Sequence, residues 1–184
     1  DGGKATYSDN VWKRPNQIKR LMEYSWVGEN VLEIGAGNGV VAQALRSILA
    51  GEFRYTGTEL STKFIEWLRL LRLKVVQADV TELPGKDYTR IIAFDSLEHV
   101  RPEHREQGYA KIASVAAPGA FLFIHFSYGV SYHNKEFDHP FGTEDLVSLE
   151  KHGFTMLKYD RTICNHPKGD IPYVFVVMQR AGET

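Results

Sequence analysis

A glycine-rich turn between an apolar strand and a helix constrains this chain more than any other feature. Residues 30–40 have the sequence Asn-Val-Leu-Glu-Ile-Gly-Ala-Gly-Asn-Gly-Val, with glycines at the alternate positions 35, 37 and 39. Glycine tolerates a positive φ angle and lets a ligand approach the backbone closely, which a β-carbon would prevent. A turn of this kind between a strand and a helix is typical of a nucleotide-binding site.

The spacing of the glycines argues against a dinucleotide ligand. A dinucleotide-binding turn has the pattern G-x-G-x-x-G, and its third glycine lets the helix pack closely on the strand. That third position is Val40 here, and the pattern present is E-x-G-x-G-x-G, which begins at Glu33. A nicotinamide-dependent oxidoreductase is therefore a remote interpretation.

Strands and helices are expected to alternate along the chain. Short apolar runs predict strands at 31–34, 53–58, 74–78, 90–94, 120–126, 154–160 and 173–179. Helical spacing predicts helices from Pro15 to near Gly28, from Val41 to a stop at Gly51, and over 64–71, 102–116 and 143–152. This order predicts an α/β fold with a doubly wound, seven-stranded, mostly parallel sheet, a terminal antiparallel strand and helices on both faces.

The size of the chain favours one domain over residues 1–184, with 1–28 as an N-terminal lid or helix and 29–184 as the core. Further domains or an oligomer stay open, since the chain starts at Asp1 without a methionine. The net charge of −1 gives no basic field for nucleic acid, so DNA is not an expected partner. No apolar run reaches the roughly 18 residues of a membrane span. The single cysteine, Cys164, fits a reducing compartment, so a cytoplasmic location is expected.

Four successive predicted strands each end near a carboxylate, at Glu33, Glu59, Asp79 and Asp95. Ligands of open α/β sheets bind at the carboxyl ends of the strands. A carboxylate there can accept hydrogen bonds from the two hydroxyls of a ribose, and another acidic group can accept from an adenine amine. Such an edge would repel a phosphate. The pattern therefore favours a nucleoside ligand that carries no phosphate.

Residues 30 to about 126 resemble the core of the class I, Rossmann-like methyltransferases that use S-adenosyl-L-methionine (SAM). Their first motif resembles the E-x-G-x-G-x-G pattern at Glu33. The run Asp95-Ser96-Leu97-Glu98-His99-Val100 resembles a stretch of small-molecule methyltransferases of the ubiquinone-pathway type. The run 117–120, Ala-Pro-Gly-Ala, resembles the turn before their fifth strand, with departures at both alanines. The resemblance implies SAM as the cofactor and S-adenosyl-L-homocysteine (SAH) as the product.

The resemblance also implies which residues hold the cofactor, with Glu33 as the acidic member of the first motif. The methionine and ribose end would be lined by Gly35, Ala36, Gly37 and Gly39. The ribose hydroxyls would bind Glu59, with Leu60 beside the adenine and with Asp79 and Val80 at the adenine edge. The residues near the sulfur would be Asp95, Ser96 and Leu97.

A base is needed only if the acceptor's nucleophile is protonated at rest, and histidine suits that role near neutral pH. The catalytic candidates are His99, after the fourth predicted strand, and His133, in the loop after the fifth. His125 and His139 are weaker candidates, and each of the four can instead have a purely structural role. No metal is expected, because the spacing of the possible ligands in 133–139 matches no standard zinc pattern.

Three hypotheses share the fold. The first is a SAM-dependent methyltransferase that moves the methyl group to an O, N or C nucleophile of a small molecule by in-line displacement. The second has a protein or RNA acceptor, and the third is a non-catalytic SAM-binding domain of a larger protein. The intact glycines and acidic residues argue against the third. The run after Phe94 lacks the D/N-P-P-Y/F motif of amino-methylating DNA enzymes, and Cys164 follows no proline as a cytosine-C5 nucleophile would. Fold analogy carries the reaction class, and the acceptor stays open.

Overall fold

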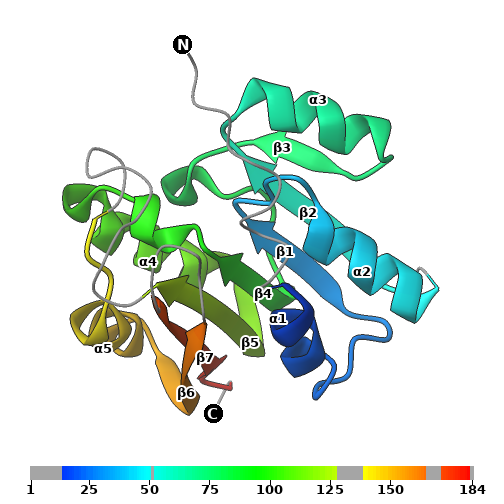
Figure 1. The fold of residues 1–184 in the computed structure, drawn as a ribbon. Coiled ribbons are helices and arrows are strands. Elements are labelled where there is room, and N and C mark those ends of the chain that lie inside the picture. Colours follow the sequence, from blue (N-terminus) through cyan, green and yellow to red (C-terminus); the bar gives the residue numbers. More distant parts are fainter. Residues whose placement is uncertain (1–13, 51, 128–138, 165–170, 183–184) are drawn as a thin grey trace.

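The computed structural model describes residues 14–50, 52–127, 139–164 and 171–182, and a seven-stranded sheet lies at the centre of this part of the chain (Figure 1). The strands are β1 (Asn30–Ile34), β2 (Arg54–Glu59), β3 (Val75–Gln77), β4 (Tyr88–Phe94), β5 (Ala116–Ser127), β6 (Phe154–Cys164) and β7 (Ile171–Arg180). The helices are α1 (Arg14–Leu21), α2 (Val40–Leu49), α3 (Thr62–Leu70), α4 (Pro102–Val115) and α5 (Thr143–Lys151), and two short 3₁₀ helices are η1 (Val80–Glu82) and η2 (Leu97–His99).

The strand order β3-β2-β1-β4-β5-β7-β6 confirms the predicted fold class. All pairs from β3 to β5 are parallel, and β7 is antiparallel to both of its neighbours. The chain goes from β1 outward to β2 and β3, then returns to the other side of β1 as β4. This reversal is the switch point where open α/β sheets bind ligands. The residues that follow β1 and β4 therefore lie side by side at the carboxyl edge.

Some boundaries differ from the sequence-based predictions, each for a local reason. Helix α1 ends at Leu21 rather than near Gly28, and the buried indole of Trp26 donates a hydrogen bond of 2.7 Å to the Leu21 carbonyl. Helix α2 ends at Leu49, its C-cap Ala50 takes the left-handed conformation with φ 49°, and Gly51 lies outside the described residues. Strands β6 and β7 are longer than predicted because their pairing continues beyond residue 160, from Arg161 opposite Val174 to Cys164 opposite Ile171.

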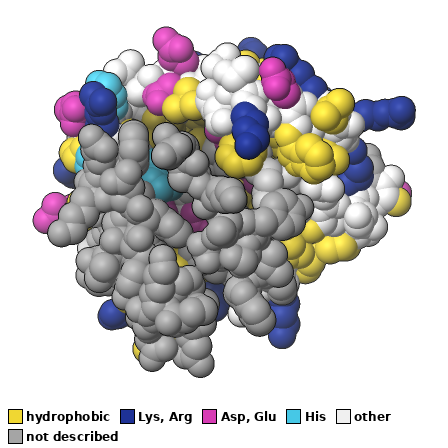
Figure 2. All heavy atoms as spheres, turned by 45° about the horizontal axis from the view of Figure 1, so that its top comes forward, with side chains coloured by type: hydrophobic (Ala, Val, Ile, Leu, Met, Phe, Trp, Pro, Cys, Tyr) yellow, Lys and Arg dark blue, Asp and Glu magenta, His cyan; other side chains and the backbone are white. Residues whose placement is uncertain are grey.

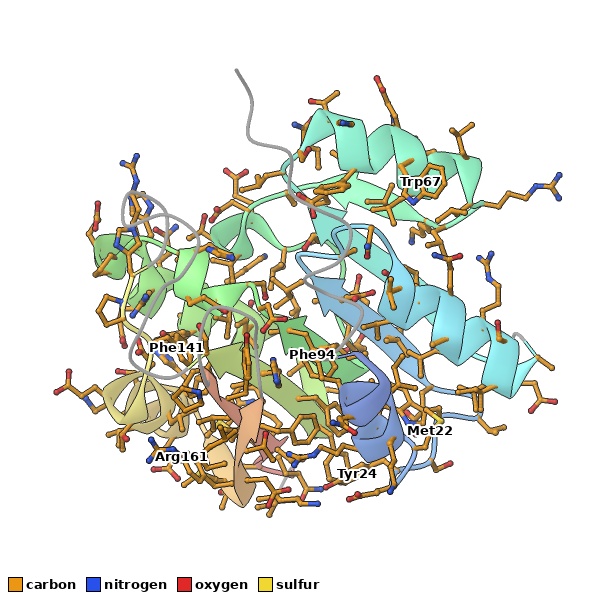
Figure 3. All side chains as sticks on the ribbon, viewed as in Figure 1. Met22, Tyr24, Trp67, Phe94, Phe141 and Arg161 are labelled. Atoms are coloured by element: carbon orange, nitrogen blue, oxygen red, sulfur yellow. The ribbon has the colours of Figure 1, made fainter. Side chains whose placement is uncertain are left out.

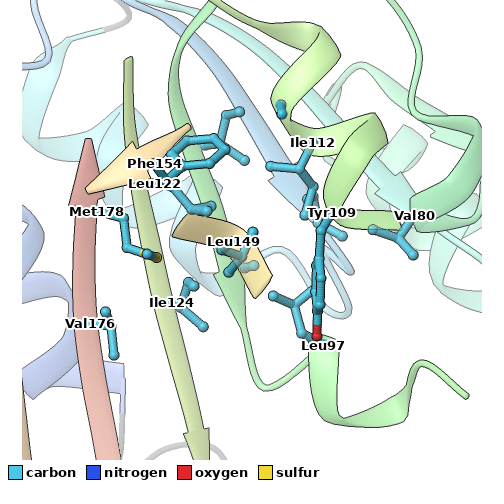
Figure 4. Close-up of a cluster of buried hydrophobic side chains, with 14 of the residues drawn as sticks. Val80, Leu97, Tyr109, Ile112, Leu122, Ile124, Leu149, Phe154, Val176 and Met178 are labelled. Carbon is cyan, nitrogen blue, oxygen red and sulfur yellow. The ribbon is translucent and has the colours of Figure 1, made fainter. Parts of the chain in front are cut away.

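The pleat of the strands divides their side chains between two hydrophobic clusters. Leu32 and Ile34 of β1 pack on the side of α4 and α5, in the cluster of Figure 4. Val31 packs on the opposite side with Trp26, Val41 and other residues of α1 and α2. Burial on both faces explains why the central strands are nearly continuous apolar runs. Glu33 lies two residues after Val31 in β1, so its side chain points to the same face of the sheet, toward α1 and α2.

A buried ion pair between α4 and α5 fixes the segment that enters α5. The guanidinium of Arg105 lies 3.1 Å from Asp145 and donates to the carbonyls of His139 and Pro140. Asp145 also accepts from the Tyr109 hydroxyl at 2.6 Å and from the Gly142 amide at 2.8 Å. Burial, followed by the Asp145 carboxylate, raises the pKa of Tyr109. Residues 139–142 are thereby tied to α4, beneath the carboxyl edge of the sheet.

Removal of the Arg105 guanidinium should destabilise the fold strongly. Arg105→Ala leaves the buried Asp145 carboxylate without its cation, which costs about 3–5 kcal/mol in the free energy of unfolding. The matched control is His152→Ala, which breaks the more exposed pair with Glu106 and should cost less than about 1 kcal/mol. Urea unfolding of both variants measures the difference, and equal losses would contradict the structural role of the buried pair.

Candidate functional site

The three glycines of the turn all have left-handed backbones, for different reasons. Their φ angles are 69° at Gly35, 52° at Gly37 and 76° at Gly39. A β-carbon at Gly35 would lie 2.7 Å from the Ser96 β-carbon, and one at Gly39 would lie 2.7 Å from a methyl of Leu68. Among the described residues, a β-carbon at Gly37 would meet nothing closer than the Gly35 carbonyl, at 4.0 Å. Gly35 and Gly39 thus permit close packing, whereas the described residues leave space at Gly37.

The carboxylate of Glu59, at the end of β2, clamps this turn. Its Oε2 accepts the Gly37 amide hydrogen at 2.8 Å, and its Oε1 accepts those of Leu60 and Ser61 at 2.9 Å each. A carboxylate has about four acceptor positions, so Oε2 retains capacity for one more donor by this count. Ser61 in turn is the N-cap of α3 and accepts from the Phe64 amide. One side chain therefore fixes the turn and the start of α3 together.

Glu33, the acidic residue inside β1, is buried under the turn. The hydroxyl of Tyr55 on β2 donates a hydrogen bond of 2.5 Å to its Oε2. Burial, followed by the Glu33 charge, holds the pKa of Tyr55 well above its usual value, so the phenol stays a donor. Gly57 makes this contact possible, because a β-carbon there would lie 2.8 Å from the Tyr55 hydroxyl. Glu33 thus links β1 to β2 through Tyr55.

The residues expected around an adenine follow the ends of β2 and β3. The Leu60 side chain is 60% exposed, and its carbonyl accepts from the Gln77 amide at 3.1 Å. Asp79 caps η1 through its Oδ1, which accepts from the amide and the hydroxyl of Thr81, both at 3.0 Å. The Val80 side chain is buried in the hydrophobic cluster that includes Tyr109 and Ile112 of α4, so it is not exposed to a ligand.

Asp95 follows β4 in a left-handed conformation, with φ 50°, that is uncommon for any residue other than glycine. Its amide donates to the His125 carbonyl at 2.8 Å, and its Oδ1 lies 2.7 Å from Nδ1 of the His125 ring. Ser96 contacts Gly35 as described above, and Leu97 is buried in the α4 cluster. Asp95 therefore joins the ends of β4 and β5 next to the glycine turn.

The structure separates the histidine candidates. His99 ends η2 and is exposed, and His133 lies outside the described residues. His139 is half-buried, and its amide donates to the Glu98 carbonyl at 2.9 Å. His125 is buried, stacks on Tyr173 with ring centroids 5.1 Å apart, and lies edge-on to Phe94, which Figure 3 labels. Its register partner on β4 is Phe94, so the adjacency of parallel strands was the signal that could have paired it with Asp95.

His125 also borders a cavity of about 360 Å³ between α1 and the strands β5, β6 and β7. The other lining residues are Asn16, Gln17, Lys19, Arg20, Glu23, Asp160, Thr162 and Phe175. Arg20 lies 3.3 Å from Asp160 and over the Phe175 ring. Glu23 pairs with Lys158 at 2.8 Å. The cavity is therefore polar and lined by both signs of charge.

The face of the molecule in Figure 2 carries no single sign of charge where described residues form it. Figure 2, which brings the top of Figure 1 forward, shows acidic, basic and hydrophobic side chains interspersed there. Trp67 of α3 (Figure 3) is 44% exposed and donates from its indole to the Asn38 carbonyl in the glycine turn. Within the described ranges, no helix is long and apolar enough to cross a membrane, and no group of three or more His, Cys, Asp or Glu residues could hold a metal ion.

The segment that holds the glycine turn and strands β1 to β4 matches a known family model. Residues 31–119 match a family model described as a methyltransferase domain. No curated protein sequence matches the chain. The family match covers Glu33, the three glycines, Glu59, Asp79 and Asp95, and it ends before His125.

Solved structures share the fold at low sequence identity. A SAM-dependent methyltransferase from Methanosarcina mazei has a TM-score of 0.75 and 17% identity, over 89% of this chain and 98% of that one. The cyclase SpnF has a TM-score of 0.73 and 16% identity, over 91% and 81%. A putative methyltransferase solved with the Trm112 activator of Haloferax volcanii has a TM-score of 0.72 and 15% identity, over 92% and 89%. Together with the family match, these confirm the class I, Rossmann-like methyltransferase fold and indicate SAM as the cofactor.

The geometry at the switch point fits that cofactor. The space that the described residues leave at Gly37 lets a ligand lie against the backbone, and Oε2 of Glu59 has capacity to accept a hydroxyl hydrogen beside it. The exposed Leu60 side chain offers an apolar surface to a purine. The fixed carboxylates at this edge would repel a phosphate, which SAM lacks.

Alanine at Gly35 should cost more stability than alanine at Gly37. Both substitutions force a left-handed backbone on alanine, at roughly 1–2 kcal/mol. Only Gly35→Ala also collides with the rigid Ser96 β-carbon, which adds about 1–3 kcal/mol of overpacking. Urea unfolding of the two variants measures the difference.

The Ser96→Gly background is the control for this comparison. Ser96→Gly removes the β-carbon that obstructs an alanine at position 35. In that background, the loss of unfolding free energy from Gly35→Ala should become smaller, while the loss from Gly37→Ala should stay the same. An excess that persists in the Ser96→Gly background would show that steric contact with Ser96 is not its cause.

Proposed function

We propose that this chain, which carries a methyltransferase domain in residues 31–119 on the class I SAM-dependent methyltransferase fold, transfers the SAM methyl group to a small-molecule acceptor. The acceptor atom is an O, N or C nucleophile that approaches the methyl carbon in line with the bond to sulfur. SAM supplies an activated methyl group, and SAH is the product. The chain's own contribution is to bind and orient the two reactants, which can provide much of the rate.

The observation that carries this proposal is the clamp between Glu59 and Gly37. It sets a fixed carboxylate beside an open, left-handed glycine at the switch point of the sheet. A ribose hydroxyl can donate to Oε2 of that carboxylate while the rest of the ligand lies along the turn. A dinucleotide or a nucleoside phosphate would bring negative charge to the same acidic edge, which disfavours both.

We propose the same cofactor-binding residues as the resemblance implied, with sharper roles. Gly35, Ala36, Gly37 and Gly39 shape the backbone surface, and Leu60, Asp79 and the Val80 backbone border the adenine. Asp95, Ser96 and Leu97 form the wall near the sulfur, with Ser96 packed on Gly35. The role proposed for Glu33 is indirect, because its carboxylate is buried and bound to Tyr55 beneath the turn. The proposed lid, residues 1–28, would begin before the described part of the chain.

A small acceptor is favoured over a macromolecule by two features. The cavity beside His125 has a volume of about 360 Å³, at the small end of the usual range for small-molecule sites. The net charge of −1, and the mixed charges on the face that Figure 2 shows, do not favour RNA binding. A protein or RNA acceptor is the second candidate, and a non-catalytic SAM-binding domain is the third.

Label transfer from methyl-tritiated SAM separates these three candidates. The protein is incubated with the low-molecular-weight filtrate, the protein fraction and the RNA fraction of a cell extract in parallel. We expect label in the filtrate alone. Label in protein or RNA would replace the small-molecule acceptor with the second candidate. SAM binding without label in any fraction would support the non-catalytic domain.

The role of Glu59 can be tested with a cycle that combines a protein variant and a ligand analogue. Wild-type protein should prefer SAH over its 2′,3′-dideoxy analogue by roughly tenfold or more, because a hydrogen bond to a charged group contributes about 1.5–3 kcal/mol. Glu59→Gln should reduce this preference, since the carboxylate charge is lost. Equilibrium dialysis with each ligand measures both ratios.

The control variant is Glu66→Gln, which changes an exposed carboxylate on α3 and should keep the full preference. Because Glu59 also holds three backbone amides, the absolute affinity of Glu59→Gln can fall for reasons of local structure. The ratio between the two ligands removes that effect. An undiminished ratio in Glu59→Gln would place the ribose elsewhere.

A further inference from the structure

The pair of Asp95 and His125 stands between the glycine turn and the cavity under α1. Asp95 is next in sequence to Ser96, which packs on Gly35, and its carboxylate lies 2.7 Å from Nδ1 of His125. His125 lines the cavity from β5. A continuous set of contacts therefore leads from the proposed cofactor site to the cavity, through two ionisable side chains.

The geometry fixes how the imidazole can act. Asp95 accepts a hydrogen bond from Nδ1, so that nitrogen carries the proton in the neutral ring. The other nitrogen, Nε2, then has a free lone pair, and it has no hydrogen-bond partner among the residues that the structure describes. Stacking on Tyr173 and the edge contact with Phe94 hold the ring in place. A carboxylate that sets the tautomer of a histidine is the arrangement of a general base.

We propose that His125 is the general base for an acceptor bound in the α1 cavity, with Asp95 as its positioning residue. This proposal rests on the proposed methyl transfer and deepens it, because a base is needed only for a protonated nucleophile. It narrows the acceptor to a small polar molecule with a hydroxyl or an N–H at the reacting atom. Thioethers and tertiary amines, which have no such proton, are excluded.

The step balances in atoms and charge. The O–H or N–H bond of the acceptor breaks, and its proton passes to Nε2 of His125. The freed electron pair forms the new bond to the methyl carbon as the carbon–sulfur bond breaks, and that bond's electrons stay on sulfur. The positive charge thus moves from the sulfonium to the imidazolium, which Asp95 stabilises, and the proton later leaves to solvent.

Other charged groups face the ring across the cavity. They are Lys19 and Arg20 on α1, Glu23 just after α1, and Asp160 on β6, with Tyr173 stacked on the ring from β7. The pairs Arg20–Asp160 and Glu23–Lys158 each combine opposite charges. Asp95 is therefore the ionised group in direct contact with the imidazole among the described residues.

Nitrogen NMR of the protein labelled with ¹⁵N-histidine tests the tautomer without any acceptor. We expect the neutral His125 ring to carry its proton on Nδ1, and Asp95→Asn to shift the population toward the Nε2–H form. A wild-type ring protonated on Nε2 would overturn the proposal, because that nitrogen would then be a donor.

Methyl transfer to the acceptor found in the filtrate tests the chemistry. His125→Gln should lower kcat by roughly 10²–10⁴-fold, the usual contribution of a general base. The deficit should shrink as the pH rises toward ionisation of the acceptor, since an ionised acceptor needs no base. Asp95→Asn should lower kcat less, and SAH binding is measured in parallel because Asp95 also borders the proposed cofactor site.

The control is His152→Gln, which alters a surface histidine paired with Glu106 and should leave the pH profile unchanged. A His125→Gln deficit that is independent of pH would indicate a structural role and overturn the proposal. Retained SAM binding with no methylated small molecule would overturn both the base and the small acceptor. If the wild-type protein did not bind SAM at all, the proposed function itself would be refuted.

Discussion

The hydrogen bond between the Glu59 carboxylate and the Gly37 amide is the interaction on which the site depends. It joins the end of β2 to a turn whose three glycines all have positive φ angles. The same carboxylate holds the start of α3 through the Leu60 and Ser61 amides. The Ala36 amide also donates to the Thr58 carbonyl of β2 at 2.9 Å, so two hydrogen bonds join the turn to this strand. The surface at Gly37 therefore depends on both β1, which leads into the turn, and β2, which ends in Glu59. It lies where the strand order of the sheet reverses.

The four strand-end carboxylates act in different ways, although they look alike in the sequence. Glu33 is buried under the turn with Tyr55, and Asp79 caps a 3₁₀ helix. Glu59 clamps the turn, and Asp95 contacts His125. Each carboxylate also organises its own strand end, so the charges are fixed before any ligand arrives. Fixed charges and dipoles of this kind are effective because they need no reorganisation when the ligand binds.

The sequence predicted the fold class and the turn because both depend on local rules. Only glycine adopts left-handed φ angles readily, and unbroken apolar runs predict strands covered on both faces. The burial of Glu33 could not be predicted, because it depends on Gly57 lying opposite and leaving room for the Tyr55 hydroxyl. The contact of Asp95 with His125 depends on the register of β4 and β5 and on the positive φ angle of Asp95. From the sequence, His99 and His133 are the first candidates for a catalytic base, because a sequence gives the order of residues along the chain but not which strands are neighbours.

The central claim is that SAM is the cofactor of this protein. Calorimetric titration of the purified protein with SAM, SAH and NAD⁺ tests it most directly. We predict that SAM and SAH bind with one-to-one stoichiometry and that NAD⁺ does not bind, since the turn lacks the third glycine of a dinucleotide site and its edge is acidic. Binding of NAD⁺ with no binding of SAM or SAH would contradict the account, and the glycine turn would then have to be assigned to a different ligand.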